Sequence, residues 1–584
     1  MDNLAIARRL SETADLMELG QENPFKVRAY RNAAQLVAGL PTAVSAMTPE
    51  ARRALPGVGK DLSARLDEML ATGTMRVLEE LRAKNPVSLL DLKRLPGIGP
   101  RTMIMLWQDL GIASPSDLEA AIRSGRLRTL RGFGPKKEAA LLKALAQRHS
   151  ILARHLLPDC HERGDALCAW LAERAPGARV STAGGIRRGL ETCTGIDIVA
   201  AGTAKQRAQI ADAFRTYSLV ETAEATDDGW TARLWGGMEA RLFVADPETC
   251  GLALIRRTGS DEHLEALAAR AAAMSLRLTP AALMRGRTPL DASTEDAVYG
   301  ALGLAWIPPE LRDGAGEIEL AARGPMPQLL ERGDLRGDLH MHTTASDGKV
   351  DTDAMAAAAR DAGLDYIVIT DHSHALPMVN GLDNTRAREH AEAVRAADRR
   401  ITGIRVLAGV ECDILVDGRM DLDDEVLQTL DFVIASLHFG LTQPRETVTP
   451  RVLRALRNPW VDLLAHPTGR KLLRRDGADL DIDAVIDTAY DEGVALEINS
   501  QADRLDLKPE YARKARERGI LIAVDSDAHS PRGLALTRWG MIMARRAGLT
   551  AADCLNARPF DAFRAALRRS RYTATGHSSP VPFS

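Results

Sequence analysis

The chain has 584 residues, a length that suggests about three to five domains rather than a single core. Its hydrophobic content of 45% and charged content of 27% are ordinary for a globular protein, and no run of about 18 apolar residues is present that could span a membrane. The six cysteines are scattered without a CxxC motif, and the first residues lack the apolar core of a signal peptide. We therefore expect a cytoplasmic protein without disulfide bonds, thiolate zinc sites or a membrane partner.

Charge is distributed unevenly along the chain. Residues 1–150 contain 23 lysines and arginines against 16 aspartates and glutamates, a net charge of +7, which leaves −10 for the remainder of a chain whose total is −3. A basic module joined to an acidic one suggests a first part that binds a polyanion and a second part that binds cations.

Residues 1–150 have a helical pattern that is interrupted by three similar turns, LPGVGK at 55–60, LPGIGP at 95–100 and LRGFGP at 130–135. Each turn follows one amphipathic helix and opens another. Glycine lets backbone amides at a helix N-terminus approach a phosphate closely, so the turns predict contacts with a nucleic-acid backbone. Plain helix packing with glycine caps is the alternative for one of the three. The predicted contact residues are Gly57, Gly59, Lys60, Gly97, Gly99, Gly132, Gly134, Lys136 and Lys137.

The pattern changes to short strands at 178–201 and 230–247, with segments such as IDIVAAG and ARLFVAD. The polar stretch 313–333 predicts an interdomain linker. After it, apolar segments such as YIVIT and VALEINS alternate with helices, which predicts an α/β barrel-like domain with its chemistry at the carboxyl ends of the strands. The last dozen residues are expected to be a frayed tail.

Metal-ligand residues follow the predicted strands of this last domain. The chain has 13 histidines, and six of them end predicted strands beside carboxylates, among them His372 after Asp371. Polar residues that merely cap strands are the alternative for any single position, but chance placement explains the whole set poorly. Imidazoles and carboxylates are ligands of zinc, manganese and iron. The candidate metal ligands at these positions are His340, His342, Asp347, Asp371, His372, Glu411, His438, His466, Asp527 and His529.

Residues 335–570 resemble a PHP (polymerase and histidinol phosphatase) domain, whose nine ligand positions are all occupied here. The resemblance implies a phosphoesterase with three divalent metals, zinc or manganese and alternatively iron, which activate water for hydrolysis. By the family pattern, His340, His342, Glu411 and Asp527 hold one metal, Glu411 bridges to a second held by His438 and His466, and Asp347, His372 and His529 hold the third. Arg470 and Arg504 are candidates for phosphate contacts, with ordinary surface arginines as the alternative.

The whole chain resembles bacterial family X DNA polymerases (PolX) fused to PHP, through ENPFKVRAYRNAAQLV at 22–37, the three turns, TGSDEH at 258–263 and STEDAVYGALGLAWIPPELR at 293–312. The implied fold is multidomain: a helical helix-hairpin-helix N-terminal region, an α+β nucleotidyltransferase-like palm and thumb, and a C-terminal α/β PHP domain shaped as a distorted barrel. The expected bounds are 1–80 and 81–150 for two helix-hairpin-helix domains, 151–248 for the palm, 249–320 for the thumb, 321–334 for the linker, 335–572 for PHP and 573–584 for the tail.

The chain departs from this family at the polymerase site. Of the three aspartates that hold two magnesium ions in a family X palm, Asp197 is present, whereas Gly195 and Arg241 stand at the other two positions. The nucleotide-binding Gly-Ser pair is replaced by Gly184–Gly185. Two-metal catalysis needs these carboxylates, so we expect negligible nucleotide addition and doubt a magnesium site in the palm. The alternative is that Glu239 or Asp246 serves instead.

The sequence therefore predicts a metal-dependent 3′→5′ exonuclease or 3′-end-processing phosphoesterase of base-excision-type repair. It is expected to act as a monomer on gapped, nicked or 3′-end-bearing DNA without sequence preference. Three alternatives stay open: an active gap-filling polymerase with PHP proofreading, a small-molecule phosphatase of the histidinol phosphatase type, and a non-catalytic DNA-end-binding scaffold.

Overall fold

The computed structural model describes residues 3–38, 40, 43–95, 98–130, 132–146 and 154–569; the predicted tail lies outside these ranges. By its own contacts the chain divides into two units, residues 1–155 with 208–241, and residues 156–207 with 242–584. None of the helices in the described ranges combines the length and apolarity needed to cross a membrane.

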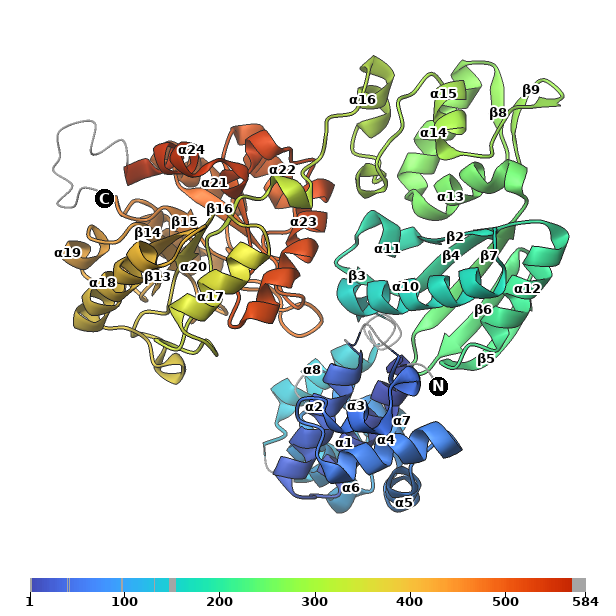
Figure 1. Ribbon diagram of the computed structural model, residues 1–584, viewed down its shortest axis with the longest axis horizontal. Helices are drawn as coiled ribbons and strands as arrows, with labels where there is room; N and C mark the ends of the chain where they lie inside the picture. Colours follow the sequence, from blue (N-terminus) through green and yellow to red (C-terminus); the bar gives the residue numbers. More distant parts are fainter. Residues whose placement is uncertain are drawn as a thin grey trace. The chain divides into compact units, whose positions relative to one another are not determined.

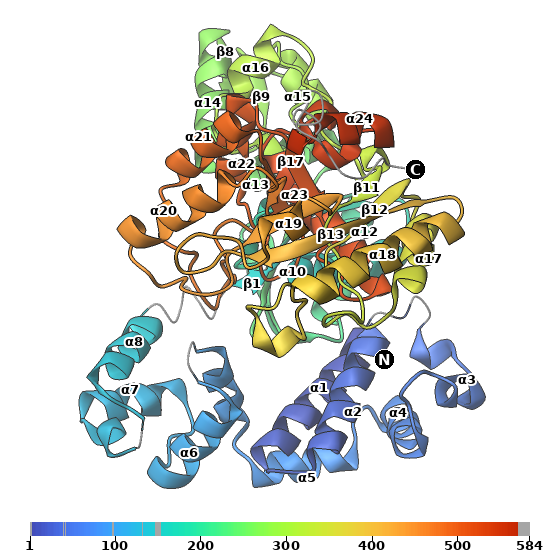
Figure 2. The same ribbon diagram turned by 90° about the vertical axis from the view of Figure 1, so that its left-hand side faces the viewer.

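The N-terminal part of the first unit is helical, as predicted (Figure 2). Its helices are short because glycine and proline punctuate them: α4 begins after Gly59, and α6 begins at Pro100 and ends at Gly111 in the left-handed region. The helices are α1 (Asn3–Leu19), α2 (Pro24–Ala38), α3 (Pro49–Arg53), α4 (Lys60–Thr72), α5 (Arg76–Lys84), α6 (Pro100–Leu110), α7 (Pro115–Arg123) and α8 (Pro135–Ala146).

The two predicted β-rich stretches contribute four strands to a five-stranded sheet in the order β2-β4-β7-β6-β5, the palm sheet, and its edge strand β5 was not predicted. Its register includes antiparallel pairing of β2 with β4, in which Ala183 faces Asp197. The elements are β1 (His155–Leu156), α10 (Leu157–Arg174), β2 (Arg179–Ala183), α11 (Gly184–Arg188), β3 (Thr192–Cys193), β4 (Gly195–Ala201), α12 (Ala204–Arg215), β5 (Val220–Thr226), β6 (Gly229–Leu234) and β7 (Glu239–Ala245).

A helical segment with a small three-stranded sheet follows the palm. The predicted linker is partly wrong, because α16 forms within it: Glu317, at the start of α16, accepts hydrogen bonds from Gly314 N and His263 Nδ1 and so ties the stretch to the preceding helices. The elements are α13 (Cys250–Thr258), α14 (Asp261–Ala273), β8 (Leu276–Leu278), β9 (Leu283–Arg285), β10 (Thr288–Pro289), α15 (Glu295–Ala301) and α16 (Glu317–Arg323).

The C-terminal domain is built on seven parallel strands in chain order, and helices surround this sheet (Figure 1). A parallel bridge between Met341 and Ala528, just beyond the first and last strands, nearly closes it into a barrel. The strands are almost wholly buried, as expected when helices cover a parallel sheet. The strands are β11 (Gly337–Asp338), β12 (Tyr366–Ile369), β13 (Arg405–Asp413), β14 (Phe432–Ser436), β15 (Leu463–Leu464), β16 (Ala495–Asn499) and β17 (Ile522–Asp525).

Most of the helices of this domain connect consecutive strands. Helix α17 packs against β12 and α18 against β13, while α23 packs against β16 and β17. Because every strand runs in the same direction, the loops that follow the strands meet at one end of the barrel. The helices are α17 (Thr352–Asp361), α18 (Asn384–Arg400), α19 (Asp424–Leu427), α20 (Arg445–Leu456), α21 (Ile482–Glu492), α22 (Pro509–Arg518), α23 (Thr537–Arg546) and α24 (Phe560–Ala566).

Candidate metal centre

All nine predicted ligands gather at the carboxyl end of the barrel. Their side chains fall into four overlapping groups in which the ligand atoms lie within 4.8 Å of one another. The convergence follows from the topology, since each residue lies in or just after a strand of the parallel sheet. The groups are His342, Asp347, His372 and His529; His340, His466 and Asp527; His340, His342 and Glu411; and His372, Glu411 and His438.

Glu411 lies at the centre of these groups and is 1% exposed. Its Oε1 atom is 3.0 Å from His466 Nε2 and 3.2 Å from His438 Nε2. Its Oε2 atom is 3.4 Å from His340 Nε2 and 3.6 Å from His342 Nε2. Because the two oxygens face different histidine pairs, the carboxylate has the geometry that a bridge between two metal ions requires.

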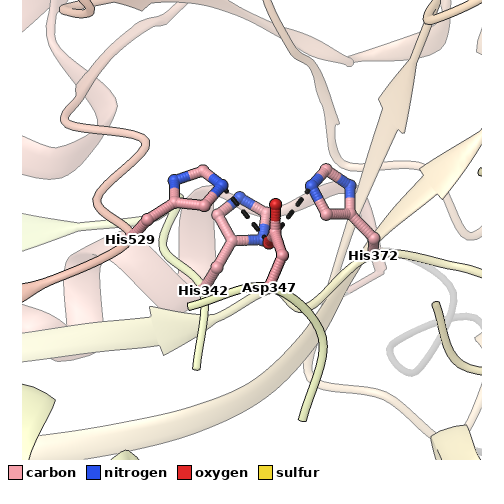
Figure 3. Close-up of side chains that lie close together, drawn as sticks. All are labelled: His342, Asp347, His372 and His529. Carbon is pink, nitrogen blue, oxygen red and sulfur yellow. Dashed lines mark ion pairs between the residues drawn. The ribbon is translucent and has the colours of Figure 1, made fainter. Parts of the chain in front are cut away.

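Asp347 occupies a third position, between His529 and His372 (Figure 3). Its Oδ1 atom is 3.3 Å from His529 Nε2 and 3.7 Å from His372 Nε2. His372 also reaches the centre, because its Nδ1 atom is 2.8 Å from Glu411 Oε2. The ring of His372 therefore lies between Asp347 and Glu411. The predicted assignment placed His372 with the third metal only and did not include its contact with Glu411.

The unsatisfied atoms of the site fit divalent metals. His340 Nε2, both ring nitrogens of His342, His466 Nδ1 and Glu411 Oε2 are buried and make no hydrogen bond within the described residues. Buried polar atoms without partners are rare in folded proteins unless a ligand engages them. Nitrogen and carboxylate oxygen in this number match the donor sets of zinc, manganese and iron.

The electrostatics favour ligand forms for most of the set. Burial lowers the pKa of His342 to about 4, and burial together with the charge of Arg504 lowers the pKa of His466 to about 3, so both imidazoles are neutral. Burial opposes ionisation of Glu411, but the neighbouring histidines outweigh it and hold the pKa of this carboxyl well below its usual range. Three histidines differ, since nearby carboxylates outweigh burial and raise the pKa of His340 well above its usual range, that of His438 to about 10 and that of His529 to about 8. Metal binding would displace these protons.

Carboxylates behind the ligands orient the histidine rings. His340 Nδ1 donates to Glu497 at 2.7 Å, and His438 Nδ1 donates to Asp413 at 2.9 Å, so that each Nε2 atom is left facing the centre. The sequence analysis missed both acids. The available signal was an acidic residue inside an otherwise apolar strand, as Glu497 is in VALEINS.

Asp371 supports the loop that carries Asp347. It accepts hydrogen bonds from the backbone and side chains of Thr343 and Ser346, and His390 Nε2 lies 2.9 Å from its Oδ2 atom. Asp371, which directly precedes His372 in the sequence, therefore stabilises this loop.

The two candidate arginines have different environments. Arg470 is 8% exposed; its Nε donates to the carbonyl oxygen of Arg504 at 2.9 Å, and its Nη2 donates to Leu505 O and to the carboxylate of Glu191. These bonds use the Nε and Nη2 atoms of Arg470, and its contact with phosphate stays a prediction. Arg504 lies close enough to His466 to lower the pKa of that imidazole, which leaves its phosphate contact as a prediction.

Comparison with known proteins covers the same segments. The family model described as the PHP domain matches residues 338–501, and DNA polymerase beta thumb matches 253–313. A helix-hairpin-helix domain matches 1–75 and a SAM-like helix-hairpin-helix tandem matches 89–147. The DNA polymerase/3′-5′ exonuclease PolX of Bacillus subtilis is 32% identical over 574 residues, which cover 97% of this chain and 99% of the relative. The chain belongs to the bacterial PolX family.

The predicted helix-hairpin-helix, thumb and PHP regions of a PolX protein are thereby confirmed. Two smaller relatives match about a third of the chain. A probable phosphatase of Caldanaerobacter subterraneus is 35% identical over 205 residues, which are 33% of this chain and 75% of the relative. One of Acetivibrio thermocellus is 32% identical over 201 residues, with shares of 33% and 78%.

The palm of this PolX-family chain places Asp197 on β4, two residues after Gly195. A Cβ atom at Gly184 would lie 2.1 Å from Asp197 Oδ2, so this carboxylate rests against glycine backbone. A Cβ atom at Gly185 would lie 3.1 Å from Leu190 Cδ1 and 3.2 Å from Cys193 Sγ. A serine at Gly185 would therefore require these two side chains to shift by a few tenths of an ångström.

Glu239 and Asp246, the residues considered as replacement ligands, each lie near an arginine. Asp246 forms an ion pair with Arg207. Glu239 lies 3.7 Å from Arg241, and both side chains are exposed. Across the described ranges, the groups of three or more side chains able to hold a metal all lie in the PHP domain.

The three N-terminal turns share one backbone hydrogen bond among their described residues. The amide of the residue between the glycines donates to the carbonyl three residues earlier: Val58 to Leu55 at 3.0 Å, and Ile98 and Phe133 to their counterparts at 3.2 Å. Gly57 and Gly132 have φ of +76° and +90°, and nothing lies within 4 Å of a Cβ atom built at Gly59, Gly99 or Gly134. The backbone is thus open to a phosphate.

Two of the nine predicted contact residues cannot be placed. Gly97 and the side chain of Lys136 lie outside the described residues. Lys60, at the first position of α4, is exposed, and Lys137 Nζ lies 4.0 Å above the Phe133 ring.

Proposed function

We propose that this PolX-family protein is a metal-dependent phosphoesterase that removes nucleotides or phosphate from DNA 3′ ends during base-excision-type repair, and that its palm adds no nucleotides. One contrast supports both parts of the proposal. The PHP centre has nine converging ligands with oriented histidines, whereas the palm has one aspartate of the expected three. Three divalent ions, zinc or manganese and alternatively iron, are the cofactors that suit the donor set.

Bound divalent ions supply Lewis-acid activation of water and neutralise the negative charge of a phosphodiester. The chain's own residues do the rest. Glu411 supplies a charge shared by two positions, Glu497 and Asp413 keep His340 and His438 in the right tautomers, and Arg504 adds positive charge beside His466. Burial of these groups excludes bulk water and strengthens each electrostatic interaction.

DNA is the proposed substrate because the N-terminal turns present open glycine amides of the kind that grip a phosphate backbone without reading sequence. The palm, without nucleotide addition, would hold gapped or nicked DNA. A cytoplasmic location, a monomeric state and the domain bounds given above remain predictions.

The test uses a 5′-labelled primer on a gapped template, incubated with Mn²⁺ and all four dNTPs. Wild-type protein and His342→Ala are compared, with circular dichroism to verify folding. We expect a ladder of shorter products that is absent with His342→Ala. A longer product would contradict the inactive palm and direct attention to Glu239 and Asp246.

A parallel reaction separates the small-molecule alternative. Histidinol phosphate and a 3′-phosphorylated oligonucleotide are offered at equal concentration, and phosphate release is measured. We expect phosphate release from the oligonucleotide. Release from histidinol phosphate alone would show that the substrate is a small molecule and not DNA. A protein that binds gapped DNA tightly but does not act on DNA ends would support the scaffold alternative.

A further inference from the structure

Charged contacts join the palm and thumb segments of the second unit to its PHP domain. Two of them end on α23: Glu310 lies 2.6 Å from Arg545, and Asp313 lies 2.6 Å from Arg546. Helix α23 carries none of the nine metal ligands. The third contact is different, because Glu191, three residues beyond α11, binds Arg470 in the loop that follows the metal ligand His466.

The loop from His466 to Arg470 is held at each of its parts. The amide of His466 donates to Glu497 Oε2 at 2.6 Å, and Thr468 donates to Asp506 Oδ2 from both its amide and its hydroxyl at 3.0 Å. His466 has φ of +28°, a conformation that side-chain-bearing residues adopt only when their surroundings enforce it. The contacts of the loop with Glu497 and Asp506 therefore fix the orientation of the His466 ring.

Arg470 forms the last of these contacts and connects two loops. Its guanidinium donates to the carbonyl oxygens of Arg504 and Leu505, so it ties the His466 loop to the segment that carries Arg504. An arginine that is only 8% exposed needs a paired negative charge. Glu191 accepts a hydrogen bond from this guanidinium, and Asp506, which also interacts electrostatically with Arg470, accepts hydrogen bonds from Thr468 through its Oδ2 atom.

We propose that Glu191 of the palm is a positioning residue for the PHP centre: through Arg470 it fixes the loop that aims His466 and the backbone that places Arg504. This inference rests on the proposed phosphoesterase function. According to this proposal, the palm supports hydrolysis by the PHP centre even if it adds no nucleotides. Glu191 touches neither substrate nor metal, so its effect should be on metal retention and on the orientation of phosphate.

The experiment compares Glu191→Ala and Glu191→Gln with Glu310→Gln in the full chain. Glu310→Gln removes an ion pair between the thumb segment and PHP that does not lead to the metal centre, and is the matched control. The readouts are the rate at which zinc-loaded protein loses metal to a chelator, the Mn²⁺ concentration for half-maximal 3′-nucleotide release, and kcat and KM measured separately.

We expect Glu191→Ala to lose metal faster and to need about tenfold more Mn²⁺, within the range for residues that support metal ligands, while Glu310→Gln changes less than about twofold. Glu191→Gln should lie between them, because it keeps an oxygen acceptor without the charge. Adding Glu191→Ala to Arg470→Ala should cause no further loss, since the two residues act through one contact.

Equal metal retention in Glu191→Ala and Glu310→Gln, both folded, would overturn the inference. If Glu191→Ala does not fold, Glu191→Gln against Glu310→Gln decides the same question. A wild-type protein that neither binds metal nor shortens DNA would instead refute the proposed function, so the two failures are distinguishable.

Discussion

The palm and the PHP domain differ in their side chains: across the described residues, the groups of three or more side chains that could hold a metal ion lie in the PHP domain. In the PHP domain, Glu411 lies within 3.6 Å of five histidines, and carboxylates behind two of the rings, those of His340 and His438, fix their orientation. In the palm, Gly195 stands two residues from Asp197, while Arg187 donates twice to Glu295, at 2.6 and 2.8 Å. Arg187 of the palm is thus paired with a carboxylate of the thumb segment.

The difference shows that the fold and the site of the palm depend on different residues. Strand β4 buries Ile196, Ile198 and Val199, each at most 1% exposed, while Gly195 and Asp197 lie on its partly exposed positions. Apolar burial therefore stabilises the palm whether or not its carboxylates are present. The fold of the palm therefore does not require carboxylates at the positions of Gly195 and Arg241.

The largest effect is expected from Glu411→Gln, which keeps the shape of the side chain but removes the charge shared by two metal positions. The rate of 3′-nucleotide release should fall by about a thousandfold, equivalent to roughly 4 kcal/mol in the barrier. Product release is followed with labelled DNA, and bound metal by elemental analysis. Glu425→Gln, the same change at an exposed position of α19, is the control. Equal activities of the two variants would place the chemistry outside the PHP centre.

A smaller effect, on stability, is expected from Glu295→Gln in the thumb segment. Glu295 pairs with Arg187 and with Arg312, which is fully buried. Loss of the charge leaves Arg312 uncompensated, and the free energy of unfolding should decrease by roughly 3–5 kcal/mol. Guanidinium unfolding followed by tryptophan fluorescence measures it, since Trp306 donates to Glu295. Asp296→Asn, at the exposed neighbour, should change little.

The stabilisation by Glu295 should depend on pH in a known direction. Burial opposes ionisation, but the two arginines outweigh it and lower the pKa of Glu295 from 4.5 to about 2. A carboxyl with a lowered pKa stabilises the fold above its unfolded pKa and loses that contribution as the pH falls through its folded pKa. The difference in free energy of unfolding between the wild-type protein and Glu295→Gln should be constant above about pH 5 and should decrease toward pH 2. A gap that widens on acidification would contradict the arrangement.

The nine ligands were predictable because a parallel barrel brings residues after its strands to one end, and the resemblance to PHP supplied their positions. Glu497 and Asp413 were missed, since a carboxylate behind a ligand has no distinct sequence pattern. The contact of Arg470 with Glu191 was missed for a related reason: an arginine after a metal ligand has the same sequence appearance whether or not it also binds a carboxylate 279 positions away. Such contacts depend on how distant segments pack, which one sequence does not specify.

The smallest effect is expected at the remaining palm aspartate. Asp197→Asn preserves the shape of a side chain that rests against Gly184, so folding should be unchanged, and 3′-nucleotide release should stay within about twofold of wild type because Asp197 is not among the PHP ligands. Nucleotide addition, measured with Mg²⁺ and a single dNTP on a gapped template, should be negligible before and after the change. In an active two-metal palm, the same substitution would abolish addition, since this aspartate helps to hold the ions. A wild-type protein that extends the primer and an Asp197→Asn variant that does not would therefore show that the palm recruits its other carboxylate from Glu239 or Asp246, and the two regions would then differ in which residues bind metal rather than in whether they do.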